Sequence, residues 1–120
     1  LNSFSDATLA ALKMAQQALV VITTLGTEAA ARALVTTLLE ERLIACGTML
    51  PAARSIYRWE GQVTEEPEVV VLLKTDATRW EALRVSVERL HPYRVPELLA
   101  LPVTAGLERY LSWLGNEVSG

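Results

Sequence analysis

Short β-branched apolar runs alternate with two amphipathic helical segments along this chain of 120 residues. Four runs have the composition of strands: 18–24, 48–60, 68–75 and 96–103. One helical segment follows the first run and the other follows the third. The order β-α-β-β-α-β is that of the ferredoxin-like split βαβ fold. We therefore predict an α+β sandwich in which two helices cover one face of a four-stranded antiparallel sheet.

The helix boundaries follow from capping residues. Thr27 is suited to cap the first helix, and Thr78 with Glu81 forms a capping box that would begin the second. His91-Pro92 would end that second helix. A last short helix is predicted near the C-terminus, ending at Gly115.

The second and third strands form an unusually long predicted hairpin, spanning residues 48–75. Gly61-Gln62 fits the centre of a type II′ turn, and Pro51 predicts a bend, bulge or edge position. Strands usually have about five or six residues, so this hairpin would project beyond its own helices. Bare strand edges pair with other chains. We expect a closed homo-oligomer in which hairpins extend neighbouring sheets.

Length and composition limit the remaining possibilities. The chain is long enough for one domain, which we assign to residues 17–116, with residues 1–16 as an N-terminal extension. The net charge of −3 argues against a nucleic-acid partner, and no segment is apolar and long enough to span a membrane. A single cysteine, Cys46, excludes an intrachain disulfide and is compatible with the cytoplasm. We see no catalytic motif and predict that the protein is not an enzyme.

Two runs combine aromatic, charged and rigid residues: 55–61 and 91–97. Tyr57 and Trp59 would share one strand face, with Arg58 on the other. Tyr, Trp and Arg are enriched at interface centres, so these three residues are our predicted interface between subunits. A second interpretation places part of these runs in a small-ligand cleft, with these residues: Trp59, Lys74, His91, Tyr93 and Glu97.

The polar and sulfur-containing candidates also have purely structural interpretations. Lys74 is suited to an ion pair with Glu97 or Glu60. His91 would bond a carbonyl or carboxylate at a helix end, and Cys46 would lie in the core. The acidic run 65–68 is expected to be a solvated loop near the hairpin tip.

Several segments resemble the CutA divalent-cation-tolerance family, in order and at the family's spacing across residues 17–115: Glu40–Cys46, Ser55–Gly61, Leu73–Thr75, His91–Tyr93, Val95–Val103 and Tyr110–Leu114. The resemblance implies a ferredoxin-like fold, a homotrimer similar to that of PII-type signalling proteins, a cytoplasmic location and a link to copper and other divalent metals.

The resemblance also implies where copper would bind. Some family members are described as using a cysteine on the first strand and two adjacent histidines, which match Thr23, Leu90 and His91 here. Only His91 has a ligating side chain, so we expect weak or accessory binding of Cu(II) or another divalent ion and no required cofactor. The function expected is divalent-metal tolerance by a cytoplasmic homotrimer. The alternative is a PII-like regulatory trimer that binds a small anion or metabolite between subunits.

Overall fold

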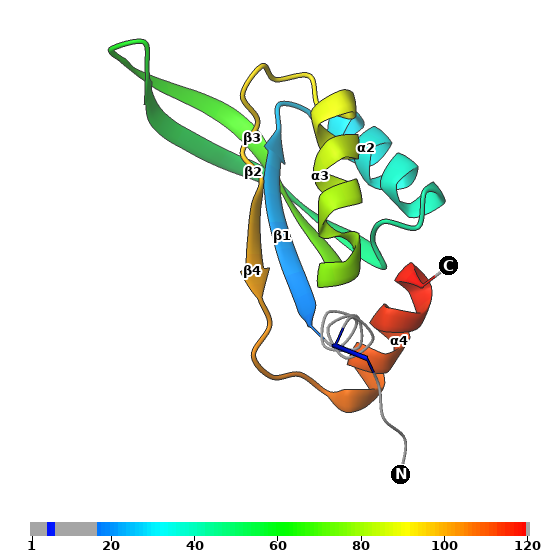
Figure 1. The fold of residues 1–120 in the computed structure, drawn as a ribbon. Coiled ribbons are helices and arrows are strands. Elements are labelled where there is room, and N and C mark those ends of the chain that lie inside the picture. Colours follow the sequence, from blue (N-terminus) through cyan, green and yellow to red (C-terminus); the bar gives the residue numbers. More distant parts are fainter. Residues whose placement is uncertain (1–4, 7–16, 120) are drawn as a thin grey trace.

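The computed structural model describes residues 5–6 and 17–119 (Figure 1). Its regular elements are, in order, β1 (Ala18–Leu25), α2 (Glu28–Glu40), β2 (Cys46–Trp59), β3 (Gln62–Asp76), the 3₁₀ turn η1 (Ala77–Arg79), α3 (Trp80–Leu90), β4 (Leu99–Pro102) and α4 (Glu108–Val118).

The four strands form one antiparallel sheet in the order β2-β3-β1-β4. In Figure 1 helices α2 and α3 lie side by side over one face of this sheet. Val21, in the middle of the central strand β1, is opposite Leu73 on β3 and Ala100 on β4. The predicted ferredoxin-like α+β fold is confirmed.

The main core lies between the sheet and helices α2 and α3. Alternate residues of β1 and β3 point into it, because successive side chains on a strand face opposite sides. The fully or nearly fully buried members from these strands are Leu19, Val21, Leu25, Val69, Val71 and Leu73. Leu34 and Leu38 of α2 and Leu83 and Val87 of α3 complete the contact.

Helix α4 covers one end of the sheet and forms a second, smaller core. Its residues Leu114 and Val118 pack with Ala18 and Ala45. The side chain of Arg79 donates a hydrogen bond to the Val118 carbonyl, which fixes the end of the helix. The prediction that this helix ends at Gly115 was wrong, because these contacts hold the final turn in place.

The hairpin of β2 and β3 is longer than predicted, with strands of 14 and 15 residues that extend away from the helices (Figure 1). Its turn is centred on Glu60 and Gly61, whose φ angles are 50° and 81°. Two positive φ angles are typical of a type I′ turn, so the predicted Gly61-Gln62 centre was one residue too late. Of the bend, bulge or edge position expected at Pro51, the bulge and the edge position are confirmed, since the register shifts between Leu50 and Ala53 and β2 is an edge strand.

Two other local predictions were wrong. Residues 65–68 are not a loop but part of β3, where Glu65 bonds Arg54 across the hairpin at 2.9 Å. The start of the second helical segment is capped by Asp76 rather than by Thr78, because the Asp76 side chain accepts the backbone N–H of Thr78. Within the described part of the chain, no helix is long and apolar enough to cross a membrane.

Candidate functional site

His91 lies directly after α3 and is only 7% exposed. Its Nε2 is 2.8 Å from the Thr24 carbonyl oxygen, and the backbone N–H of Tyr93 donates to Nδ1 at 3.1 Å. A carbonyl oxygen can only accept, so Nε2 carries a proton, whereas Nδ1 accepts an N–H and carries none. The imidazole is therefore neutral. Both ring nitrogens therefore have partners within the subunit.

Tyr93 extends this cluster to the base of the hairpin. Its hydroxyl donates to Glu68 at 2.7 Å, and Glu68 is only 8% exposed. Burial, and then the hydrogen bond to Glu68, raise the pKa of Tyr93. Burial lowers the pKa of His91, although the Thr24 carbonyl and the Glu68 charge act in the opposite direction. The cluster is thus polar but largely shielded from water, and His91 is held in its neutral form.

The predicted interface residues lie near the hairpin tip. Tyr57 and Trp59 share a face of β2 with Ala53, which is opposite Glu68. The Arg94 guanidinium lies 5.7 Å from the centre of the Trp59 ring, which links the segment after α3 to the hairpin. Arg58 points to the other face of the hairpin, as predicted from the alternation.

Lys74 lies apart from this cluster. It is opposite Val20 of β1, whereas His91 contacts Thr24, four residues farther along the same strand. At 3.3 Å per residue this is a separation of about 13 Å. Lys74 Nζ donates to Thr48 Oγ1 at 2.7 Å, so the predicted ion pair with Glu97 or Glu60 is not formed within the subunit.

The five predicted cleft residues are therefore not gathered in one subunit. His91 and Tyr93 are in contact, with ring centres 4.7 Å apart. Glu97 is exposed, and Trp59 lies at the hairpin tip. A cleft that uses all five residues would have to form between subunits, and it stays a prediction.

Cys46 and Thr23 also bear on metal binding, and neither belongs to the cluster around His91. Cys46 is half-buried rather than in the core, and its Sγ is 3.7 Å from the Tyr110 hydroxyl. Thr23 is fully buried, and its Oγ1 has no hydrogen-bond partner. In the described part of the chain no three His, Cys, Asp or Glu side chains are grouped as a metal site.

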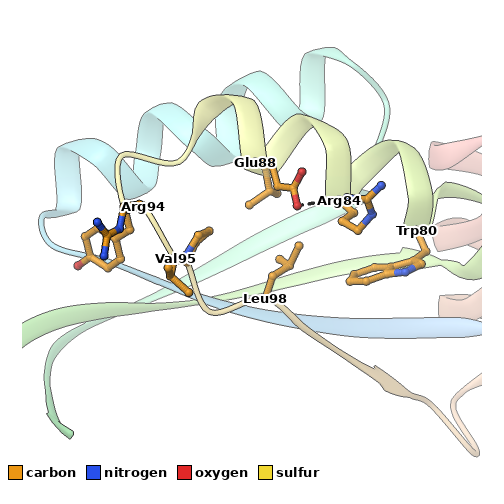
Figure 2. Close-up of a pocket in the computed structure, with 9 residues that line it drawn as sticks. Trp80, Arg84, Glu88, Arg94, Val95 and Leu98 are labelled. Atoms are coloured by element: carbon orange, nitrogen blue, oxygen red, sulfur yellow. Dashed lines mark hydrogen bonds and ion pairs between the residues drawn. The ribbon is translucent and has the colours of Figure 1, made fainter. Parts of the chain in front are cut away.

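Sequence reasoning missed a cavity of about 490 Å³ between α3 and the segment that leads to β4. Figure 2 shows Trp80 at one end of it, Arg94 at the other and Leu98 between them. Arg84 on its rim is paired with Glu88 at 3.2 Å. The cavity is lined by Trp80 of α3 and by Pro96 of the segment that follows the helix. These residues are far apart in the sequence, so no local pattern could have indicated the cavity.

One face of the sheet is covered by neither α2 nor α3. The register places seven apolar side chains on this open face: Val20, Ile22, Leu50, Val70, Leu72, Leu99 and Leu101. Leu50, Leu99 and Leu101 are between 46% and 55% exposed. Large exposed apolar surfaces are typical of sites that contact a protein, a membrane or a ligand.

Comparison with known proteins agrees with these observations. The sequence model of the family described as CutA1 divalent ion tolerance protein matches residues 19–117. A divalent-cation tolerance protein CutA from Pectobacterium atrosepticum is 46% identical over 81% of this chain and 88% of its own length.

Solved structures give the same result. CutA from Xylella fastidiosa superposes with a TM-score of 0.83 at 37% identity, covering 85% of this chain and 98% of that one. A protein from Archaeoglobus fulgidus described as periplasmic divalent cation tolerance protein CutA gives a TM-score of 0.82 at 27% identity, covering 85% of this chain and 99% of that one. The chain belongs to the CutA1 divalent ion tolerance family.

Proposed function

We propose that this protein is a cytoplasmic homotrimer, without enzymatic activity, that contributes to tolerance of divalent metal ions, copper among them. Membership of the divalent ion tolerance family supports the metal link. The observation that best supports a trimer is the open face of the sheet, where seven apolar side chains lie outside the helix-covered core.

The edges of the sheet support assembly as well. β2 is an edge strand of 14 residues, and β4 is the other edge. Long unpaired edges are rarely left exposed in soluble proteins. In the proposed trimer each hairpin extends along the sheet of a neighbour, and Tyr57, Arg58 and Trp59 lie at the contact between subunits.

Metal binding in this trimer is weak or accessory, because the residues present do not fit a tight copper site. His91 is the sole ligand among the three positions expected from the family resemblance, and both of its ring nitrogens are already engaged. A metal on Nδ1 would displace the Tyr93 N–H and leave a partly buried donor unsatisfied, at a cost of about 1–3 kcal/mol. Further ligands would have to come from a second subunit.

Calorimetric titration of Cu(II) into the assembled protein tests this proposal. We expect saturable binding weaker than about 1 µM, which corresponds to less than ~8 kcal/mol, and its loss in His91→Ala. Cys46→Ala is the matched control and should bind copper as the unchanged chain does. Tight binding that persists in His91→Ala, or no binding at all, would contradict the proposed role of His91.

A further inference from the structure

A second cavity, of about 250 Å³, lies where the end of the sheet meets α4. Its walls are mainly apolar, formed by Leu19, Val20, Val103, Leu111 and Leu114. Small-molecule sites are typically apolar cavities that carry a few polar groups to orient the ligand.

Polar groups converge on this cavity. Lys74 and Tyr110 line it, and Cys46, which contacts the Tyr110 hydroxyl, is opposite Lys74 across the hairpin. Lys74 is half-buried, and its ammonium has three donors, of which one is used by Thr48. No carboxylate among the described residues lies within ion-pair distance of it.

We infer that this cavity binds a small organic carboxylate, with the carboxylate at Lys74 and Tyr110 and the apolar part among Val103, Leu111 and Leu114. A partly desolvated ammonium without a counter-ion is stabilised by an anion. The apolar walls favour a ligand whose remaining atoms are hydrocarbon. An inorganic anion would satisfy Lys74 but leave the apolar space unfilled. This binding goes beyond the proposed metal function and does not use His91, although Val20 belongs both to the cavity and to the open face of the sheet.

Benzoate, with nine non-hydrogen atoms, is a probe of suitable size, and benzamide is its uncharged counterpart. We expect the assembled protein to bind benzoate with a dissociation constant of about 1 mM or lower, by calorimetry and by amide shifts in nuclear magnetic resonance spectra. Benzamide should bind at least about tenfold more weakly, because it lacks the charge that pairs with Lys74. The shifts should centre on Val103 and Leu111.

Variants test the charged part of the site, at Lys74, separately from its apolar part. Lys74→Met should weaken benzoate binding by about tenfold or more, while Arg32→Met, which makes the same charge change at an exposed site on α2, should leave it unchanged. Ala105→Trp places a large ring at the lining of the cavity and should abolish binding without altering Lys74. Ala105→Trp keeps the test valid if Lys74→Met does not fold.

Three results would overturn the inference: no benzoate binding at about ten times the expected constant, equal binding of benzamide, or unchanged binding in Ala105→Trp. None of these results bears on the proposed metal function, which is read out by copper titration and by the mass of the assembly. Benzoate binding would also favour the regulatory alternative, in which a small anion acts on the trimer.

Discussion

Both faces of the sheet carry large apolar residues, but the two faces meet different surroundings. Leu73 on the helix-covered face is completely buried, whereas its neighbour Leu72 on the open face is half-buried. An isolated antiparallel sheet usually alternates apolar with polar residues, because one face meets water. Here the alternation is lost in the centre of β1 and β3. The comparison shows two apolar faces: one is covered within the chain, and the other is the face that we propose contacts a second copy.

The largest expected difference is between Leu73→Ala and Leu72→Ala. Leu73→Ala leaves a cavity in the core and should lower the free energy of unfolding by about 2–5 kcal/mol. Leu72→Ala should weaken the contact between subunits, so its cost should depend on protein concentration. Urea unfolding at two protein concentrations a hundredfold apart measures both. Equal losses that do not vary with concentration would place both faces in the core of a single chain.

Gly47→Ala tests the close packing of the helix-covered face. An added Cβ would lie 2.8 Å from Val35 Cγ1 and 2.9 Å from Val35 Cγ2, well inside normal contact. Overpacking of this kind costs about 1–3 kcal/mol. Gly26→Ala is the matched control, because its Cβ would make only a 3.4 Å contact with the Tyr93 hydroxyl. Thermal unfolding of both variants distinguishes them, and equal stability would mean that α2 can move away from β2.

Stability should fall in mild acid because of His91. Burial lowers its folded-state pKa below the usual 6.5, so the unfolded chain binds the proton more readily. The free energy of unfolding should therefore be constant above about pH 6.5 and should decrease as the pH falls from there to the lower folded-state value. His91→Gln should remove this part of the pH dependence in urea unfolding series. A dependence unchanged in His91→Gln would assign it to other groups.

The smallest expected effect is at the hairpin tip. Arg94→Met removes the contact with Trp59 and an ion pair with Glu60 at 3.9 Å, both exposed to water. We expect a loss of about 0.5–1 kcal/mol, measured by thermal unfolding against Arg32→Met as a control. A decrease in the free energy of unfolding of more than about 2 kcal/mol would show that the hairpin tip contributes to stability as much as a core residue does.

The fold was predictable from the sequence because each element has its own local signal. The order of strands and helices, the long hairpin and the bulge at Pro51 all follow from periodicity and from proline chemistry. The errors lie where distant contacts override local signals. Helix α4 passes Gly115 because Arg79 holds its final turn, and Glu68 is buried because Tyr93, in the segment after α3, packs against it.

The site was predictable only in part. The sequence singled out His91, Tyr93 and Lys74 as candidate cleft residues, and the structure places only His91 and Tyr93 in contact. It did not indicate that Lys74 lies at the opposite end of β1 from His91, because that depends on strand register. The cavity beside Tyr110 depends on where α4 packs, which is set by contacts from Arg79 and Ala45.

The mass of the folded protein in solution tests most directly whether the open face is a contact between copies. Light scattering at micromolar concentration should return three times the 13.2 kDa of one chain, and Leu72→Asp should reduce this to the mass of a single folded chain. A folded unchanged protein with the mass of one chain would contradict the account, since the apolar face would then be stable in water without a partner.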